Sequence, residues 1–467
     1  MKDSKRPLRG LTNGPIAPTL IAFAFPLLIT NFLHTMTGTW NAVWVSHLLG
    51  PEDLVAVTNA NVLLGILIGS IMGFGMAAGV SVGQSIGADD LRSAHRVVGT
   101  SIGFGICGGL VIAAVGLFGV NFIVDLIQIP AEARQQTITY FQIVCFSMPT
   151  QFFFIFTMMI LRSSGDARTP FIFNLIWIGL GLALTPILLT GSFGLPKFGI
   201  AGAALSGWIS NATTLVAMII YVYRKDMPLA LRGSNLRFLR PNPKILFMLA
   251  KRGIPTAAES LMVQGAYFAL LTLVNAYGVV TAAGYSVAAQ LWGYVLMPTM
   301  AFAASMTAMA AQNIGANQWD RVNKIAIRGC TISIILTAGM AATIYALGDL
   351  PLRLFLPDGG EPLEIAREIN NIVLWSWPVV AITFGLFAIV KANGVMLPSA
   401  IIFAITMWGL RIPFANLLQP TLGEAAIWIS YPVGTFTSAL LAYAYYRFGK
   451  WREHELMSTT LYEPASK

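Results

Sequence analysis

Long stretches with no charged residue, or with only one, constrain this chain more than any other feature of its sequence. A membrane-spanning helix needs about 20 apolar residues, and eleven such stretches, one of them long enough for two spans, provide twelve spans. Lipid offers backbone groups no hydrogen-bond partner, so each span is expected to be a helix. The stretches are 17–49, 54–88, 97–124, 135–161, 169–196, 198–223, 253–319, 329–348, 369–390, 392–423 and 425–446.

The composition agrees with a membrane protein. Only 10% of the residues are charged and 56% are hydrophobic, whereas about 25% of the residues of soluble domains are charged. An ordinary soluble domain, a disordered chain and a coiled coil are therefore excluded. We predict an all-α polytopic membrane protein.

The positions of the basic residues predict the orientation. If the N-terminus is inside, 24 of the 29 Lys and Arg residues fall on the cytoplasmic side, as the positive-inside rule requires. Both termini are then cytoplasmic. The net charge of +9 reflects this topology, so nucleic acid is not an expected partner.

The chain divides into two similar halves. A polar linker at 224–252, with eight basic residues and one acid, separates an N-terminal lobe at 1–223 from a C-terminal lobe at 253–467. Six spans in each lobe predict parallel repeats about a pseudo-two-fold axis along the membrane normal, which is the design of a transporter. Landmarks recur 228 or 229 residues apart: Gln84 and Gln312, Pro26 and Pro255, Pro149 and Pro378, Arg162 and Lys391, and Gly165 and Gly394.

Several loop motifs resemble those of the multidrug and toxic compound extrusion (MATE) family. The most specific is LRSSGDARTP at 161–170, supported by the Gln-x-x-Gly-Ala loops at 84–88 and 312–316. GIAGAALSGWIS from Gly199 and GEAAIWISYPVG from Gly423 agree with it. The resemblance implies a twelve-helix exporter that expels organic, often cationic, compounds in exchange for H⁺ or Na⁺. The motifs also have a structural reading, in which Gly87 and Gly315 allow tight reversals.

An antiporter needs a group that exchanges a cation within the membrane, and such ionisable groups are few. Glu259 is the one acid inside a span, one turn after Pro255. On the first span, His34 and Asn41 lie on one polar helical face. Glu259 and His34 can each either exchange protons or have a purely structural role. For His34 we favour the structural role, in which a neutral imidazole ring is hydrogen-bonded to a neighbouring helix.

Departures from the family pattern bear on the coupling ion. Where one branch of the family carries carboxylates in the N-terminal lobe, this chain has Asn41 and Thr185. Another branch places a Glu eight residues after the proline of the seventh span, where this chain has Val263. The usual cation sites therefore do not transfer, and we expect H⁺ rather than Na⁺ coupling.

The remaining candidates are apolar or aromatic. Aromatic rings attract cations and methionine adapts to varied shapes, although such residues commonly just pack helices. Pro26 and Pro255 are candidate hinges or static kinks, and Arg411 is expected to snorkel to the outer face. The substrate-cavity candidates are Trp40, Trp44, Tyr267, Gln290, Tyr294 and Met297.

These features predict a secondary multidrug antiporter in a bacterial plasma membrane. We expect a monomer without cofactor or metal, in contact with membrane lipids and transporting small organic, mostly cationic substrates. A flippase for lipid-linked oligosaccharides, or a polysaccharide exporter, is the alternative within the same superfamily. An intramembrane enzyme would need a catalytic constellation that one Glu and one His do not provide.

Overall fold

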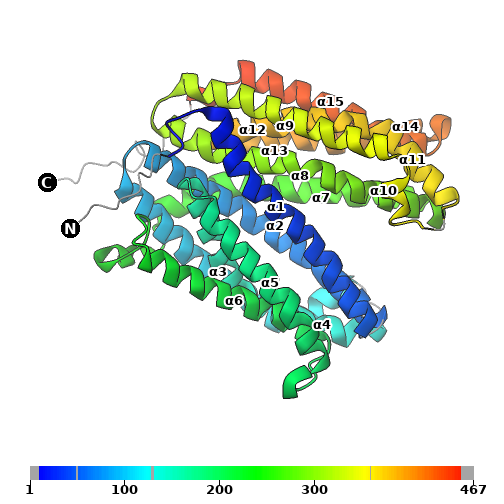
Figure 1. Cartoon of the computed structure of the whole chain (residues 1–467), viewed down its shortest axis with the longest axis horizontal. Helices are drawn as coiled ribbons and strands as arrows, with labels where there is room; N and C mark the ends of the chain where they lie inside the picture. Colours follow the sequence, from blue (N-terminus) through cyan, green and yellow to red (C-terminus); the bar gives the residue numbers. More distant parts are fainter. Residues whose placement is uncertain (1–9, 49–50, 128–130, 358, 454–467) are drawn as a thin grey trace. The chain divides into compact units, whose positions relative to one another are not determined.

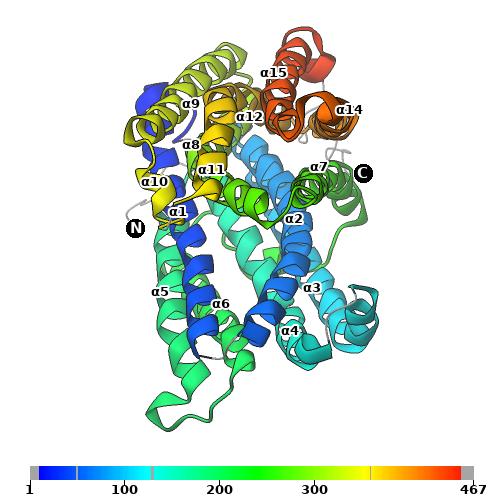
Figure 2. The same ribbon diagram turned by 90° about the vertical axis from the view of Figure 1, so that its right-hand side faces the viewer.

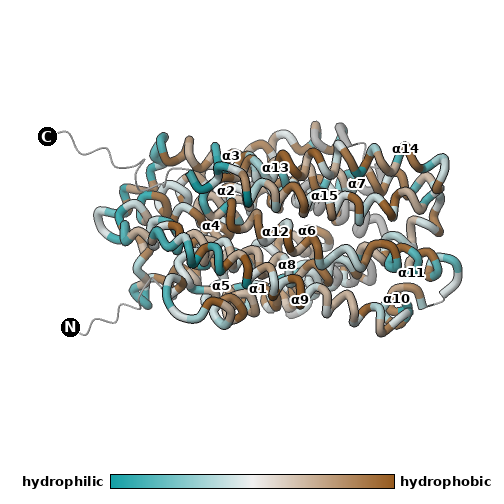
Figure 3. The backbone as a smooth tube through the Cα atoms, turned by 90° about the horizontal axis from the view of Figure 1, so that it is seen from above, coloured by the Kyte–Doolittle hydropathy of each residue, from teal (hydrophilic) through white to brown (hydrophobic). Residues whose placement is uncertain are grey.

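The computed structural model describes residues 10–48, 51–127, 131–357 and 359–453, and within these ranges the chain is helical and contains no strand (Figure 1). In this described part, 12 helical segments are long and apolar enough to cross a membrane. Their apolar residues run along the helices, while hydrophilic residues are commonest near the loops (Figure 3). The predicted all-α polytopic fold is confirmed.

The described chain forms two compact units. Unit 1 contains Ile29–Lys251, and unit 2 contains Leu11–Leu28 and the chain from Arg252 onward. The expected linker at 224–252 thus lies in unit 1 except for its last residue. Two helices are shared, because the division falls inside α1 (Ile16–Leu48) and inside α7 (Pro243–Asn275).

Each unit consists of long helices joined by short connections. Besides its parts of α1 and α7, unit 1 contains α2 (Pro51–Gly87), α3 (Leu91–Ile127), α4 (Ala131–Ser163), α5 (Arg168–Thr190), η1 (Ser192–Gly194), α6 (Ile200–Arg224) and η2 (Gly233–Leu239). Unit 2 contains α8 (Val279–Gly315), α9 (Trp319–Leu347), α10 (Leu350–Arg353), α11 (Glu361–Val373), η3 (Leu374–Ser376), α12 (Trp377–Ala392), α13 (Leu397–Phe403), η4 (Ala404–Arg411), α14 (Ile412–Leu422), α15 (Ala425–Phe448) and η5 (Lys450–Glu453).

The same helix pairs are in contact in both units. In unit 1, α4 contacts α2, α3 and α6, and Figure 2 shows α3 and α4 side by side. In unit 2, α12, which contains the equivalent Pro378, contacts the equivalent helices α8, α9 and α15. The pairs α5 with α6 and α14 with α15 also correspond. The duplicated sequence therefore folds into duplicated packing.

Within unit 2, α8 is the central helix and α9 is peripheral. Of the residues in the most apolar stretch of α8, 72% are buried, against 22% in α9. Small residues let neighbouring helices approach α8 closely, as is usual inside membranes. A Cβ on Gly284 would lie 2.8 Å from the carbonyl oxygen of Pro362 in α11.

The turns that connect the spans are also repeated. Gly165 and Gly394 have φ of 93° and 85°, in the left-handed region that glycine adopts without strain. After α2 and α8, however, the left-handed residues are Asp89 and Asn317, with φ of 61° and 57°. The expectation that Gly87 and Gly315 make these reversals is wrong, because both are the last residues of their helices and neither is among the glycines with positive φ.

Two predicted spans are irregular helices. The span at 369–390 begins earlier, at Glu361, and is interrupted by η3 just before Pro378, since proline provides no backbone donor. The span at 392–423 contains a π-helix over Ala404–Arg411, immediately before Pro413. π-Helical turns are rare and often accompany functional sites.

Two glycines on α8 provide a matched test of this packing. Gly284→Ala should lower the free energy of unfolding by about 1–3 kcal/mol, because its new methyl group meets the α11 backbone. Gly293→Ala meets no atom within 4 Å and should stabilise the helix by about 0.5–1 kcal/mol. Unfolding in mixed micelles measures both. Equal effects of the two variants would contradict the close approach of α8 and α11.

Candidate functional site

A buried ion pair lies in unit 2 between α7 and α12. Lys391 Nζ donates to both carboxylate oxygens of Glu259 at 2.8 Å, and Ser399 Oγ donates to Oε2 at 2.6 Å. The side chains of Glu259 and Lys391 are each 10% exposed. A charge removed from water must be paired and hydrogen-bonded, and this carboxylate satisfies both conditions. Glu259 is thus held by three helices, α7, α12 and α13.

Local sequence explains how these three side chains meet. Lys391 lies in the last turn of α12, the left-handed Gly394 reverses the chain, and Ser399 lies in the first turn of α13. Gly394 lies directly against the guanidinium of Arg252, since a Cβ there would be 2.6 Å from Arg252 Cζ. Arg252 is 6% exposed. A second buried cation, Arg252, thus lies against the turn that joins the helices of Lys391 and Ser399.

Unit 1 carries a different set of residues at the equivalent positions. Counting back 229 residues, Thr30 replaces Glu259, Arg162 replaces Lys391 and Pro170 replaces Ser399. Thr30 is buried, and Arg162 Nε has no hydrogen-bond partner in the described part of the chain. The duplicated scaffold thus carries this carboxylate ion pair only in unit 2.

His34 contacts α5. Its Nε2 lies 3.2 Å from Asn174 Oδ1, while Asn174 Nδ2 donates to Pro170 O at 2.9 Å. Because that second bond fixes the amide orientation, Nε2 of His34 is the donor and carries the hydrogen. The ring also packs on Trp177, with 5.1 Å between centroids. His34 is thus hydrogen-bonded to the neighbouring helix.

Asn41 belongs to a neutral polar cluster in unit 1. Thr185 Oγ1 lies 3.5 Å from Asn41 Oδ1 and 2.8 Å from Ser206 Oγ. Trp40 and Trp44, on either side of Asn41, make an edge contact at 5.7 Å, and Trp40 is 43% exposed. The cluster brings α1, α5 and α6 together through uncharged groups.

Unit 2 contains an aromatic cluster that the sequence did not single out. The ring of Tyr285 packs on Trp292 and Trp428, and its hydroxyl is hydrogen-bonded to that of Tyr431 at 2.5 Å. Tyr267 stacks on Tyr285 at 6.3 Å. Of these residues, only Tyr267 was a cavity candidate; Trp428 and Tyr431 belong to the GEAAIWISYPVG motif, and Tyr285 and Trp292 lie within the apolar stretch of α8.

The other substrate-cavity candidates lie along α8. Met297 is 8% exposed and therefore a core residue. Tyr294 packs against a cluster around Leu291 and Leu352, and Gln290 is half-buried. These three candidates therefore occupy both core and partly accessible positions of α8.

Arg411 does not snorkel to the outer face. It lies near the middle of its span, is 9% exposed, and its guanidinium carbon lies 3.2 Å from the centroid of the Tyr431 ring. Nη1 contacts Met407 Sδ at 3.4 Å, while Nε and Nη2 have no hydrogen-bond partner among the described residues. Gly434 lies beside the arginine stem, since a Cβ there would be in van der Waals contact with Arg411 Cδ, at 3.4 Å. The expectation failed because the aromatic ring that receives the cation lies on another helix, α15, and meets Arg411 only when the helices pack.

Among the described residues, no group of three or more His, Cys, Asp or Glu side chains lies close enough together to hold a metal ion. The site chemistry is therefore that of one ion pair, two polar clusters and aromatic rings. Such a set can bind and exchange ions or organic molecules.

Comparison with known proteins identifies the family. The MatE family model matches residues 26–187 and again 255–417, so both halves of the chain match the same model. The chain is 29% identical over 460 residues to the probable multidrug resistance protein YoeA of Bacillus subtilis, covering 98% of this chain and 99% of that protein. It is 25% identical over 429 residues to the multidrug export protein MepA of Staphylococcus aureus, covering 92% of each.

Solved structures share the fold. An outward-facing MATE family transporter of the MOP superfamily superposes with a TM-score of 0.87 at 20% identity, covering 96% of this chain and 98% of that one. A MOP superfamily transporter from Pyrococcus furiosus gives the same TM-score, identity and coverage.

The fold and these matches define a polytopic membrane transporter and not an enzyme. More particularly, the chain belongs to the MatE family, the multidrug and toxic compound extrusion family that its loop motifs resemble. The alternative of an oligosaccharide flippase is not favoured by these relatives.

A double-mutant cycle tests the energetics of the ion pair. Glu259→Gln and Lys391→Met should each lower the free energy of unfolding by about 3–5 kcal/mol, because each leaves a buried polar or charged partner unsatisfied. The double variant should regain most of that loss. Unfolding in mixed micelles gives the coupling energy.

The surface pair of Arg367 and Asp349 is the control for this cycle. Its side chains are 48% and 28% exposed, and the guanidinium hydrogen-bonds hold the pKa of Asp349 below its usual range. Solvent screens such exposed pairs, so they contribute little to stability. A Glu259–Lys391 coupling energy no larger than that of this pair would show that the buried contact does not stabilise unit 2.

Proposed function

We propose that this protein is a multidrug efflux antiporter that exports small organic, often cationic, compounds in exchange for protons. Relatives over the whole chain are named multidrug resistance or multidrug export proteins, and they come from bacteria. The proposed location is therefore the bacterial plasma membrane, with both termini in the cytoplasm. This orientation rests on the distribution of Lys and Arg.

The observation that carries the coupling proposal is the buried Glu259–Lys391 pair. Ionisable groups at membrane depth are costly and are retained mainly where they act. Among the described spans, Glu259 is the carboxylate held deepest in the protein, with an 8% exposed residue surface. Its carboxylate also connects α7 to Lys391 of α12 and Ser399 of α13, so a change at this carboxylate reaches all three helices.

Proton exchange at Glu259 would alter the charge of the site. With Glu259 ionised the pair is neutral, and protonation leaves the Lys391 charge without its partner. The unpaired charge of Lys391 would then favour a rearrangement of α7 relative to α12 and α13. The rearranged state would persist until the carboxyl group releases its proton on the other side of the membrane. The substrate flux and the proton flux are coupled if substrate binding and proton binding favour different conformational states of the transporter.

The polar cluster of unit 1 supports H⁺ over Na⁺. Na⁺ sites in proteins gain from a carboxylate, and the groups around Asn41 are the neutral oxygens of Thr185 and Ser206. His34 is engaged with Asn174. Neither arrangement supplies a negative charge to hold a sodium ion.

Pro26 and Pro255 are proposed hinges. Each lies inside a long helix, α1 or α7, where the missing backbone donor weakens the helix. The division of α1 between the two units falls at Leu28–Ile29, close after Pro26, and that of α7 falls at Lys251–Arg252, close before Pro255. A bend at these positions would let each unit move as a body.

The proposed substrate contacts are the aromatic candidates with accessible faces. Trp40 and Tyr267 are 43% and 40% exposed, and Trp44 packs on Trp40. Their rings can attract an organic cation. Tyr431 is not in this set, because the guanidinium of Arg411 already covers its ring.

Transport by Glu259 variants tests the coupling residue. In proteoliposomes with an imposed pH gradient, Glu259→Gln should lower substrate exchange at least about tenfold, since it removes the proton-binding group. The double variant Glu259→Gln with Lys391→Gln should also fail, although it leaves no unpaired charge. Glu364→Gln, at an exposed position of α11, should transport normally. Proton-driven exchange at the wild-type rate by the well-folded double variant would remove Glu259 from the coupling.

The choice of ion is tested with separate gradients. An inward pH gradient should drive ethidium out of wild-type proteoliposomes, and an inward Na⁺ gradient at equal pH should not. The physical reason is the lack of a carboxylate in the Asn41 cluster. Efflux driven by Na⁺ alone, abolished by Asn41→Ala, would overturn the proposed ion.

A further inference from the structure

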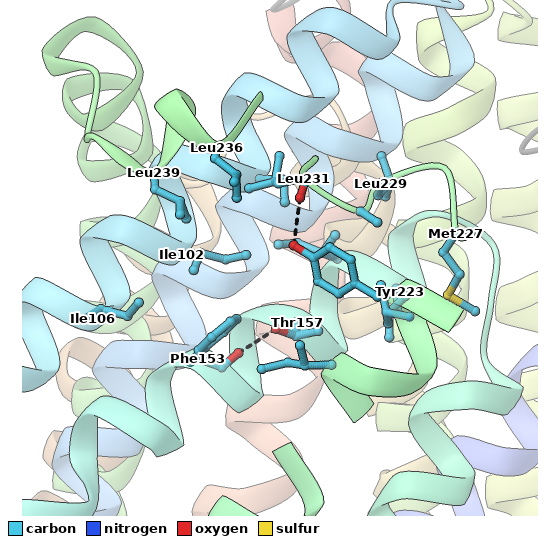
Figure 4. Close-up of a pocket in the computed structure, with 16 residues that line it drawn as sticks. Ile102, Ile106, Phe153, Thr157, Tyr223, Met227, Leu229, Leu231, Leu236 and Leu239 are labelled. Atoms are coloured by element: carbon cyan, nitrogen blue, oxygen red, sulfur yellow. Dashed lines mark hydrogen bonds between the residues drawn. The ribbon is translucent and has the colours of Figure 1, made fainter. Parts of the chain in front are cut away.

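Unit 1 contains an apolar cavity that takes no part in the proposed transport cycle. It has a volume of about 270 Å³ and lies between α3, α4 and α6 and the segment that follows α6 (Figure 4). Ile102, Phe153 and Leu239 are among the residues that face it (Figure 4). The cavity is closed partly by the basic linker, so its wall combines membrane helices and a predicted cytoplasmic segment.

Among the described residues that line the cavity, no polar side chain is free. The polar side chains in this set are those of Thr157 and Tyr223, and both hydroxyls are engaged, as Figure 4 shows. Thr157 donates to Phe153 O at 2.8 Å, and Tyr223 donates to Leu231 O at 2.7 Å. An occupant of this cavity is therefore hydrocarbon in character.

The linker is a fixed wall of this cavity. Gly99 and Gly103 lie one turn apart on α3, and a Cβ on either would collide with the linker, 2.5 Å from Phe238 Cβ and 1.9 Å from Leu239 O. η2 therefore lies directly on the α3 backbone through two glycines. Because this contact holds the linker in place, the leucines of the linker cannot simply move inward to fill the space.

Basic side chains surround the cavity on the linker side. Arg232 is ion-paired with Asp226 at 2.8 Å, donates to Tyr223 O, and lies over the Tyr223 ring. The guanidinium of Arg237 lies over the ring of Phe238. Arg237 directly follows Leu236, which lines the cavity. The linker at 224–252 holds eight basic residues and one acid, so its charge is far from balanced within the chain.

Apolar surface is also exposed at this edge. Leu236 is 49% exposed and Tyr223 is 39% exposed, although both line the cavity. Exposed apolar side chains on and beside a linker with eight basic residues and one acid match a molecule with an apolar tail and an anionic head. Anionic phospholipids have this chemistry, and they attract basic segments at the cytoplasmic surface of membranes.

We propose that this cavity binds one acyl chain of an anionic phospholipid, with the lipid phosphate against Arg232 and Arg237. The tail replaces the void between the helices and the linker, and the head supplies the negative charge that the linker lacks. The lipid thereby fixes the linker to unit 1. The site is separate from the ion pair of unit 2 and does not depend on the proposed transport function.

Lipid retention by the purified full-length protein tests this proposal. Native mass spectrometry of detergent-solubilised protein, titrated with palmitoyl-oleoyl phosphatidylglycerol, should show one retained lipid per chain. Phosphatidylcholine with the same chains should be retained at least about fivefold less. Equal retention of the two lipids would overturn the anionic-head part of the proposal and leave an uncharged apolar site.

Two kinds of variant separate the tail from the head. Ile102→Trp fills the cavity and should abolish the specific lipid, whereas Arg232→Gln with Arg237→Gln should remove the preference for phosphatidylglycerol. The control Lys324→Gln with Arg328→Gln removes the same charge from exposed positions of α9 and should retain the wild-type preference. If well-folded Ile102→Trp protein bound the lipid as the wild-type protein does, the proposal would be wrong.

A probe in the intact cavity covers the case in which Ile102→Trp does not fold. Leu236→Trp places an indole at the edge, and its added fluorescence should be quenched by phosphatidylglycerol brominated along the acyl chain. Quenching should be at least about twofold weaker with brominated phosphatidylcholine. The acyl-chain site would be contradicted if brominated phosphatidylglycerol quenched the Leu236→Trp protein no more than the wild-type protein. It would also be contradicted if a nonionic organic compound alone displaced the lipid.

Discussion

The hydrocarbon interior of the membrane cannot satisfy polar groups, and this constraint governs the whole structure. Backbone groups are satisfied inside helices, and many buried hydroxyls donate to a carbonyl of their own helix, as Ser210 does to Ser206 O and Ser305 to Ala301 O. The same constraint applies to charge. Glu259 is buried because Lys391 and Ser399 satisfy its carboxylate, so the functional candidate and the stability of unit 2 depend on one set of contacts.

The two units show how duplication separates scaffold from chemistry. Equivalent helices contact each other in both units, and equivalent turns use left-handed residues at Gly165 and Gly394. Yet the position of Glu259 is Thr30 in unit 1. Helix packing tolerates such a change because it depends on size and shape, whereas the proposed proton exchange depends on one carboxyl group. A duplicated transporter can therefore retain two similar lobes and confine its buried ion pair to one of them.

The cations of the chain have three different roles in this arrangement. Lys391 neutralises a carboxylate, Arg411 lies against the face of Tyr431, and Arg232 and Arg237 remain at the surface beside an apolar cavity. Their surroundings explain the difference. A buried cation needs a fixed partner from the protein, either an anion or an aromatic face, while a surface cation at the membrane is available to lipid phosphates.

The sequence by itself determined the number of spans, the all-α class, the duplication and the family, because long apolar stretches and short loop motifs are local signals. It also identified Glu259, since a carboxylate inside a span is rare. Its partners Lys391 and Ser399 lie 132 and 140 residues away along the chain, and no local pattern relates such positions. The burial of Arg411, the aromatic cluster around Tyr285 and the apolar cavity beneath the linker were likewise decided only by tertiary structure, because each is formed by side chains from helices that are distant in sequence and meet only after packing.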